Sequence, residues 1–253
     1  MFLELLRKND LFAPITEFDG NTLLGRAQKH RGILKDIDPS AAIAQAEEHI
    51  CPELRTFGRH SKFFWPLGYF HPTQAQDVII DNVRRGRLST KFRKPEHIFD
   101  FDAQNRLVKI FQVIDPTTVL CESDGNDACY ICIKEVDGAP EISWTYLARY
   151  EDGGALRQLV SNSWDFHFQN TLWYSIEDYG ELKNGSRLCR FYDISFEDEK
   201  RISYSDIDRT TRVFHFSYDL LCDEHGRVCD ILSYNGQDVE EYPDVKWCRE
   251  QRP

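Results

Sequence analysis

Two stretches of the chain share one short hairpin pattern, and this pattern limits the possible fold more than any other feature of the sequence. Residues 101–107 (FDAQNRL) and 222–228 (CDEHGRV) both read apolar-Asp-x-x-[Asn/Gly]-Arg-[Leu/Val]. The Asp side chain can accept hydrogen bonds from backbone N–H groups two residues further on, and Asn or Gly supplies the positive φ that closes the turn. Because alternating apolar and polar residues flank both stretches, each predicts an antiparallel β-hairpin.

Apolar residues recur with a period of two from about residue 95 to the end of the chain. Turn signals containing glycine, such as Asp137-Gly138, separate the alternating runs, and no long helical segment lies between them. This arrangement favours an antiparallel meander over a parallel sheet. The pattern predicts strands over residues 97–102, 107–114, 117–122, 128–136, 142–150, 155–163, 164–169, 187–194, 212–221 and 227–234.

The first part of the chain reads mainly as helices. Residues 1–8 fit a short amphipathic helix, and Asp38-Pro39 is a good N-cap and first-turn pair for a helix over residues 40–50. A capping box at residues 73–76 opens another helix. The predicted fold class is therefore α+β, with an N-terminal helical segment packed on a large, irregular, mostly antiparallel β-sheet. The predicted regions, which could form one fused domain, are residues 1–94 (mainly helical) and residues 95–253 (β-rich).

Length and cysteine placement bear on the compartment. A chain of 253 residues can bury a core without covalent staples, and its eight cysteines are scattered through apolar contexts. The first eight residues carry mixed charge too early for a signal peptide, and the longest uncharged apolar-rich run, residues 63–71, is far too short to span a membrane. We therefore expect a cytoplasmic protein that does not associate with membranes.

The net charge of −11 is unevenly distributed along the chain. Residues 1–100 contain 15 Lys and Arg against 13 Asp and Glu, whereas residues 101–253 contain 16 against 29. This excess of acids weighs against nucleic-acid binding, because phosphate contacts need basic groups, and it is compatible with a basic protein partner. A simpler alternative is that acidic loops keep a sheet-rich protein soluble and protect its edges.

Cysteine and histidine positions offer two candidate sites. Cys129 and Cys132 fall on opposite faces if their segment is a strand, so the two thiols cannot converge on a metal, and buried structural cysteines are expected. His167 and His215 both stand between phenylalanines. If their strands were neighbours, the two imidazoles could bind a metal or act as acid and base; the alternative is a pair of exposed strand histidines.

Other motifs are weaker. Asp100 and Asp102 lead into the first hairpin turn, and the Asp206/Asp208 pair lies in a polar connection, so solvated charge explains both pairs better than a cation does. Residues 20–25 resemble the start of a phosphate loop, but Arg26 replaces the required Lys. No catalytic motif is recognised, so the sequence favours a protein without catalytic activity, cofactor or metal.

A basic segment over residues 84–94 holds six Lys and Arg and no acid. Three interpretations are open: a cationic helix C-terminus, docking of this segment against the acidic part of the chain, or phosphate binding.

The hairpin pattern is similar to the YD or Rhs repeats of bacterial secreted toxins and to hairpins in small proteins encoded near them. The similarity covers two matches of seven residues and lacks the regular period of Rhs shells, since the arginines of the pattern and of a related step at Arg187 are 81 and 40 residues apart. In general character the chain also resembles immunity proteins of polymorphic or contact-dependent toxin systems. That second resemblance transfers no residues.

These observations lead to a first functional hypothesis and two alternatives. The first is a non-enzymatic, acidic protein-binding module, such as an immunity protein that neutralises a basic toxin. One alternative is an enzyme or ligand-binding protein with a pocket at the helix–sheet junction involving His167 and His215, and the other is a structural subunit that pairs through a sheet edge. The sequence does not determine an oligomeric state. The predicted partner-binding residues are Glu197, Asp198, Glu199, Asp206, Asp208, Glu240, Glu241 and Asp244.

Overall fold

One large antiparallel sheet dominates the structure. The computed structural model describes residues 2–9, 11–12, 20–59, 67–72, 86–164, 171–181, 186–197, 212–222, 228–234 and 237–238. Within these residues thirteen strands form a single sheet in the order β13-β12-β11-β10-β9-β8-β7-β6-β5-β4-β3-β1-β2. Every neighbouring pair is antiparallel, and from β3 to β13 the strands follow one another along the chain. The predicted α+β class with a mostly antiparallel meander is confirmed.

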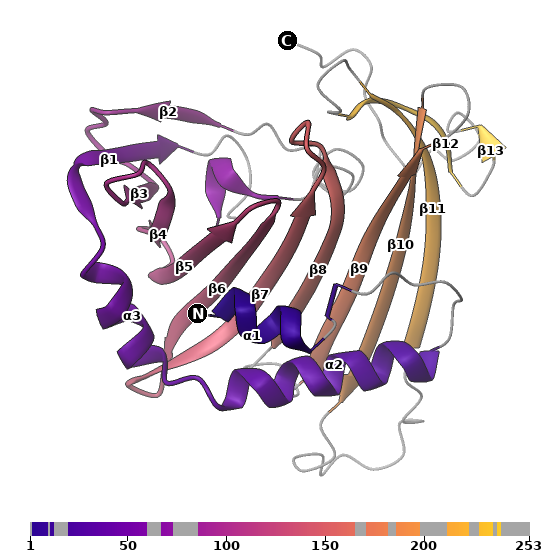
Figure 1. Cartoon of the computed structure of the whole chain (residues 1–253), viewed down its shortest axis with the longest axis horizontal. Helices are drawn as coiled ribbons and strands as arrows, with labels where there is room; N and C mark the ends of the chain where they lie inside the picture. The colour runs from indigo at the N-terminus through magenta and orange to yellow at the C-terminus, as the bar shows by residue number, and fades with distance from the viewer. Residues whose placement is uncertain are drawn as a thin grey trace.

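The strands are long in the middle of the sheet and short at both edges, as Figure 1 shows. Their bounds are β1 Cys51–Arg59, β2 Arg87–Ser89, β3 His97–Phe101, β4 Leu107–Gln112, β5 Thr117–Asp124, β6 Asp127–Val136, β7 Ala139–Tyr150, β8 Leu156–Trp164, β9 Thr171–Glu181, β10 Ser186–Glu197, β11 Arg212–Cys222, β12 Val228–Tyr234 and β13 Gln237–Asp238. Short edge strands limit edge-to-edge pairing between molecules.

Local turn chemistry forms the hairpins as predicted. In the β3–β4 turn, Asp102 Oδ1 accepts hydrogen bonds from the backbone N–H groups of Gln104 at 2.9 Å and Arg106 at 2.8 Å, and Asn105 has a φ of 61°. Asp137 and Gly138, with φ values of 53° and 82°, form the two-residue turn between β6 and β7. The second hairpin of the shared pattern is also confirmed, since β11 pairs with β12, although its turn residues 223–227 lie outside the described part of the chain.

Three α-helices precede the first strand: α1 Phe2–Lys8, α2 Gly20–Lys35 and α3 Pro39–Glu47, while a short 3₁₀ helix, η1, covers Gly68–Phe70. The sequence analysis predicted α1 and α3 but not α2. The Asp38 side chain caps α3 as predicted, because it accepts hydrogen bonds from the backbone N–H groups of Ser40 and Ala41. The helix predicted after residue 73 lies outside the described residues. Figure 1 shows α1, α2 and α3 on one side of the sheet.

Four strands, β1, β2, β9 and β13, were not predicted from the sequence. The first two precede residue 95 and join the same sheet as β3. The burial pattern of β1 has no alternation, because most of its side chains are exposed, so a period-two search misses it. The division of the chain at residue 94 stays a prediction.

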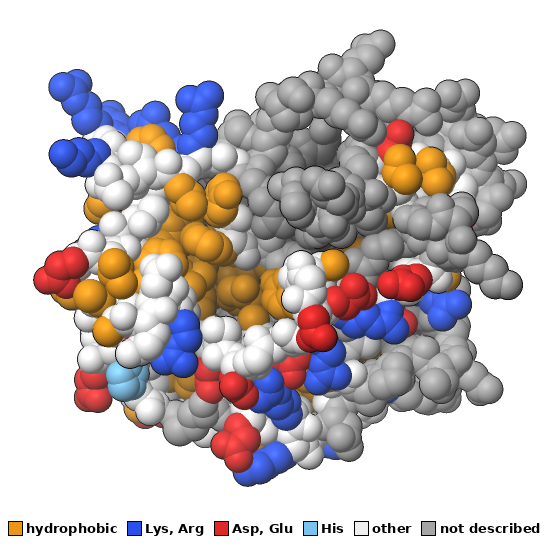
Figure 2. All heavy atoms as spheres, turned by 45° about the horizontal axis from the view of Figure 1, so that its top comes forward, with side chains coloured by type: hydrophobic (Ala, Val, Ile, Leu, Met, Phe, Trp, Pro, Cys, Tyr) orange, Lys and Arg blue, Asp and Glu red, His pale blue; other side chains and the backbone are white. Residues whose placement is uncertain are grey.

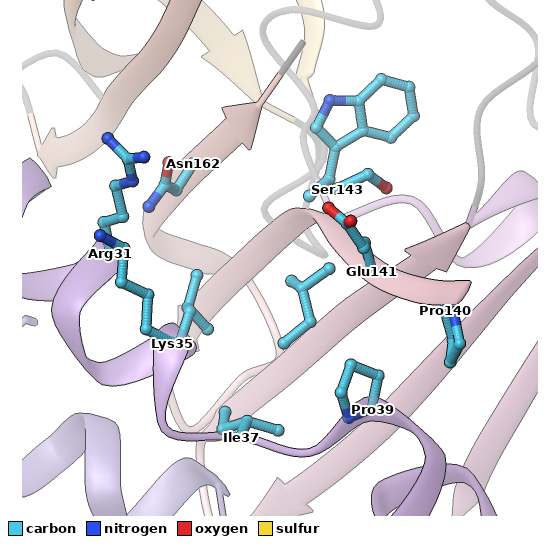
Figure 3. A pocket seen from close by; sticks show the side chains of 11 residues that line it. Arg31, Lys35, Ile37, Pro39, Pro140, Glu141, Ser143 and Asn162 are labelled. Atoms are coloured by element: carbon cyan, nitrogen blue, oxygen red, sulfur yellow. The ribbon is translucent and has the colours of Figure 1, made fainter. Parts of the chain in front are cut away.

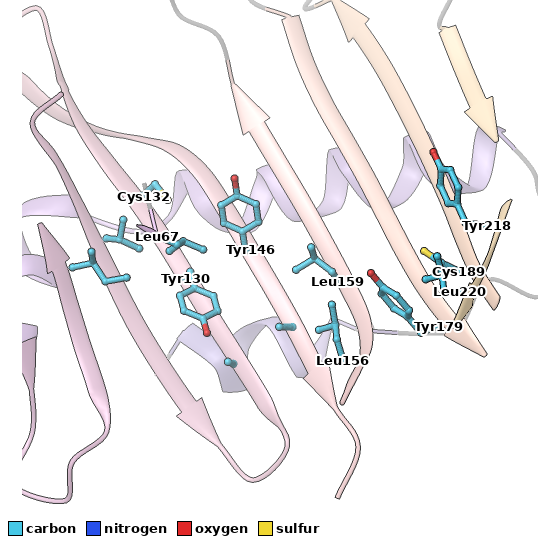
Figure 4. Packing of buried hydrophobic residues seen from close by; sticks show 14 of the residues in the cluster. Leu67, Tyr130, Cys132, Tyr146, Leu156, Leu159, Tyr179, Cys189, Tyr218 and Leu220 are labelled. Carbon is cyan, nitrogen blue, oxygen red and sulfur yellow. The ribbon is translucent and has the colours of Figure 1, made fainter. Parts of the chain in front are cut away.

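Buried apolar side chains form two clusters, one on each side of the sheet. The strand pleat divides them: Cys129 and Ile131 belong to the cluster on the helix side, and Tyr130 and Cys132 to the cluster on the other side. Leu3 and Leu6 of α1, Ala27 of α2 and Ala42 of α3 belong to the helix-side cluster. On the opposite side, Figure 4 shows tyrosines and leucines of successive strands lying next to one another. Among the described residues no helix has the length and apolar character needed to cross a membrane.

Candidate functional site

A pocket of about 390 Å³ opens between the C-terminal half of α2 and strands β7 and β8. Figure 3 shows the side chains of Arg31 and Lys35 extending from α2 on the same side of the pocket as Asn162 of β8. The residues that line the pocket are Arg31, Leu34, Lys35, Ile37, Pro39, Pro140, Glu141, Ile142, Ser143, Trp144 and Asn162. The site therefore joins two cationic side chains to apolar walls, one carboxylate (Glu141) and a few neutral polar groups from the sheet.

Helix α2 places its side chains on two faces. Ala27 and His30, three residues apart, are fully buried, and Ile33 contacts the helix-side cluster. Arg31 and Lys35, four residues apart, lie on a neighbouring face and reach the pocket. Because the face with Ala27 and His30 is buried, the face with Arg31 and Lys35 points into the pocket.

A row of polar side chains lies beneath α2, in a core that is otherwise apolar. Thr145 of β7, Asn162 of β8 and Tyr174 of β9 stand directly opposite one another in the strand register and point to the same side of the sheet. His30 of α2 lies over this row: its Nε2 is 3.2 Å from Thr145 Oγ1, and its ring meets the Tyr174 ring edge to face at 6.0 Å. We call His30, Thr145, Asn162 and Tyr174 the polar row.

Three hydrogen-bonding atoms of the polar row are unpaired. The four side chains are at most 4% exposed, yet His30 Nδ1, Asn162 Nδ2 and Tyr174 Oη have no hydrogen-bond partner in the described structure. Each unpaired buried group typically costs about 1–3 kcal/mol of stability. Natural cores rarely keep such groups without a reason, and a ligand or bound water is a common one.

Burial also sets the protonation of the polar row. It lowers the pKa of His30 to about 3 and raises the pKa of Tyr174. Both rings are therefore neutral at physiological pH. The imidazole has one donor and one acceptor nitrogen, and the phenol keeps its proton.

A second buried polar group on the same side of the sheet has the opposite character. Asp127, at the start of β6, receives hydrogen bonds from Arg7 Nε at 2.8 Å, Arg149 Nε at 2.8 Å and Arg149 Nη2 at 3.2 Å. Arg7 also donates to the Asp124 carboxylate at 2.6 Å and to its backbone carbonyl at 2.7 Å. Burial alone would raise the pKa of Asp127, but the hydrogen bonds from Arg149 and Arg7 outweigh it and lower that pKa. We call Arg7, Asp127 and Arg149 the arginine clamp.

The chemistry available at the pocket favours binding over catalysis. A His30 side chain with a pKa near 3 is a poor base at neutral pH. The Ser143 hydroxyl donates to the backbone carbonyl of Cys132 at 3.2 Å, so its hydrogen bond among the described residues goes to a carbonyl and not to a base. Burial raises the pKa values of the Cys129 and Cys132 thiols. In the part of the chain that the structure describes, no three His, Cys, Asp or Glu side chains converge as metal ligands.

The structure places some of the residues singled out from the sequence. Cys129 and Cys132 belong to clusters on opposite sides of the sheet, as predicted. The expectation of solvated charge at Asp100 and Asp102 is wrong, because both side chains are buried and Asp100 accepts a hydrogen bond from Arg55 at 2.6 Å. His215 lies in β11 opposite Tyr192, and the neighbours of β11 are β10 and β12. His167 lies outside the described residues, so its distance from His215 is not described.

The predicted partner-binding acids lie almost entirely beyond the described ranges. Glu197 is the last residue of β10, and its side chain is not described. The other seven, Asp198, Glu199, Asp206, Asp208, Glu240, Glu241 and Asp244, lie outside the described residues. Their role in partner binding stays a prediction.

The described part of the basic segment is exposed. Arg87, Lys91, Arg93 and Lys94 all face solvent, and Arg59 of β1 donates to the Lys94 carbonyl at 2.9 Å. Figure 2 shows Lys and Arg side chains gathered at the end of the molecule where β1 and β2 lie. The interpretation of this segment as a helix C-terminus does not apply from Arg87 on, because residues 87–89 form β2.

The pocket was not predicted from the sequence because α2 was not predicted. This helix contains three glycines and has a weakly amphipathic sequence, so propensity and periodicity both argue against it. The signal that could have found it is the spacing of Ala27, His30 and Ile33, every third residue over two turns. The cross-strand row from Thr145 to Tyr174 had no local signal, because it depends on the pairing of three strands.

No protein-family model matches this chain, and no curated protein or solved structure shows a significant match to it.

Proposed function

We propose that this protein binds a small anionic molecule in the pocket between α2 and the sheet, without catalysing a reaction. The observation that carries the proposal is the position of Arg31 and Lys35 on one side of the pocket, next to the buried amide of Asn162. Guanidinium and ammonium groups provide charge-assisted hydrogen bonds for a carboxylate or phosphate. A pocket of about 390 Å³ is within the usual range for small-molecule sites.

The other walls favour a ligand with an apolar body. Leu34, Ile37, Pro39 and Ile142 supply aliphatic surface next to the cations. The proposal includes the expectation that the N-terminal helical segment packs on the sheet, because the pocket lies between them. The hydrogen-bond contact of His30 with Thr145, and the helix residues in the helix-side cluster, support it.

Replacement of both cations tests this proposal. We expect wild-type protein to bind 4-methylpentanoate, a carboxylate with an aliphatic body, in calorimetric titration. The Arg31→Gln/Lys35→Gln variant should bind at least ~10-fold more weakly, since it loses two charge-assisted contacts. Lys29→Gln is the matched control, because Lys29 is an exposed cation of the same helix that does not line the pocket. Equal binding by the double variant, or no binding by the wild type, would contradict the proposal.

We also propose, as a second candidate, that the protein is an acidic module for a basic protein partner, such as a toxin that it neutralises. The uneven charge supports this proposal, because residues 101–253 hold 29 acids against 16 Lys and Arg. The contact residues proposed are the eight acids predicted from the sequence. Electrostatic complementarity of this kind speeds association and weakens as salt rises.

Charge reversal tests the second candidate. Replacement of Glu197, Asp198 and Glu199 by Lys should weaken the salt-sensitive capture of a cationic ribonuclease several-fold. A matched reversal at Glu135 and Asp137, which are exposed acids beside the β6–β7 turn, should have a smaller effect. Capture that is the same at low and high salt would contradict this candidate.

A further inference from the structure

We infer that the ligand of the α2 pocket carries a neutral hydrogen-bond acceptor beside its anionic group, and that this acceptor pairs with the side-chain amide of Asn162. This inference rests on the proposed function and deepens it, because it names the ligand as a small 2-oxo or 2-hydroxy acid. Asn162 is the residue from which we infer this, since it belongs both to the lining of the pocket and to the polar row.

The side-chain amide of Asn162 is buried and unpaired. Asn162 is 4% exposed, and its Nδ2 has no hydrogen-bond partner in the described structure. Its neighbours on the same side of the sheet include Val160 and Ile176, both fully buried, so an aliphatic residue would suit this position better than an amide does. An unpaired amide donor in the lining of a pocket is accounted for when a ligand supplies the acceptor.

The second step concerns the spacing of the two ligand groups. His30 belongs to the polar row, and Arg31, the next residue of α2, lines the pocket. Figure 3 shows the side chains of Arg31 and Lys35 on the same side of the pocket as Asn162. An anionic group held by these cations therefore lies on the same side of the pocket as the amide, so a neutral acceptor on an atom next to the anion can face the amide. A carbonyl or hydroxyl on the carbon next to a carboxylate has this spacing.

The third step concerns the rest of the row. Thr145 and Tyr174 stand on either side of Asn162 on neighbouring strands, and His30 lies over Thr145. These side chains limit the rotamers open to the amide, so they act as positioning residues. A site of this kind selects its ligand strongly, because an acid without the neutral acceptor leaves the amide unpaired.

Two acids that differ by one carbonyl test the inference. Calorimetric titration with 4-methyl-2-oxopentanoate and with 4-methylpentanoate measures the contribution of the 2-oxo group directly. We expect wild-type protein to bind the oxo acid ~10-fold or more tightly than the plain acid. Asn162→Leu should abolish this preference by weakening the binding of the oxo acid to the level of the plain acid.

Stability measurements on the same variants complete the test. Asn162→Leu should unfold at the same temperature as wild type or at a higher one, because it removes an unpaired donor from an apolar core. If that variant does not fold, Asn162→Ala serves in its place with the same expected loss of preference. Equal affinity of wild type for the two acids, or a preference that persists in the variant, overturns the inference while the proposed function stands. Binding of neither acid overturns both.

Discussion

The arginine clamp and the polar row lie on the same side of the sheet, yet they differ in how completely their hydrogen bonds are made. In the clamp, Asp127 receives three hydrogen bonds from two arginines, and Arg7 extends the network to Asp124. In the polar row, one contact joins His30 to Thr145, and three polar atoms have no partner in the described structure.

This difference separates a structural role from a ligand-binding role. A buried carboxylate with full partners ties α1 to the β5–β6 turn, so the clamp stabilises the fold. Unpaired buried polar groups lower stability. Their presence is accounted for when a ligand or a bound water supplies the missing hydrogen-bond partner. Asn162 of the polar row lines the pocket, where a ligand can reach it, whereas Asp127 of the clamp is the first residue of β6.

Removal of the central acid of the clamp should have the largest effect on stability. Asp127→Ala leaves Arg7 and Arg149 without their shared partner, and we expect a loss of about 3 kcal/mol in the free energy of unfolding in urea. Asp124→Asn is the control, because the Asp124 side chain is 74% exposed and its loss should cost much less. Similar losses in the two variants would show that the clamp is not a cooperative network.

The buried His30 of the polar row should lower the free energy of unfolding at mildly acidic pH. Burial lowers the pKa of His30 from 6.5 to about 3. At mildly acidic pH, His30 therefore binds a proton in the unfolded chain but not in the folded one. The free energy of unfolding should therefore fall as pH drops below about 6.5, by about 2 kcal/mol between pH 6.5 and 5. His30→Leu should remove this slope, and His49→Gln, which changes an exposed histidine, should keep it. A slope that survives in His30→Leu would contradict the burial of a neutral imidazole.

The clamp should respond in a lower pH window. The pKa of Asp127 lies below its ordinary value of 3.8 in the folded state, so its stabilising effect is present above about pH 4 and disappears as pH falls further. The free energy of unfolding, measured from pH 5 to 2.5, should fall less steeply in Asp127→Asn than in wild type. Parallel curves would mean that the arginines do not stabilise the carboxylate form.

The smallest effect should come from the hydroxyl of Tyr174. Tyr174→Phe removes an unpaired buried group and keeps the ring that meets His30, so the stability should stay within about 1 kcal/mol of wild type or rise. Thermal unfolding measures this change. A loss of more than about 2 kcal/mol would show that the hydroxyl is paired in solution, and it would remove the contrast between the polar row and the clamp.

The sequence predicted the elements that depend on local chemistry. The Asp102 turn, the Asp137-Gly138 turn and the Asp38 cap each lie within a few residues of the groups they bind, and all were predicted. Helix α2 was not predicted because it is stabilised by the burial of Ala27 and His30 in the folded protein and not by the helix propensity of its own residues.

The candidate site could not be predicted, because it is assembled from distant parts of the chain. Thr145 and Asn162 meet through a strand register, and His30 reaches Thr145 across 115 residues of sequence. Sequence analysis turned instead to His167 and His215, whose local settings look alike. The expectation of a ligand pocket that involves His167 and His215 stays a prediction, and the buried histidine of the polar row is His30.

The side-chain amide signals of Asn162 in a ¹H–¹⁵N spectrum test the central claim most directly. The pair of signals that disappears in Asn162→Leu identifies them. During titration of the wild type with 4-methyl-2-oxopentanoate, these signals should shift in a saturable way, with the proton that bonds the ligand moving downfield. If other amides near the pocket shift while the Asn162 signals stay in place, the amide is not a ligand donor and the account of the polar row is wrong.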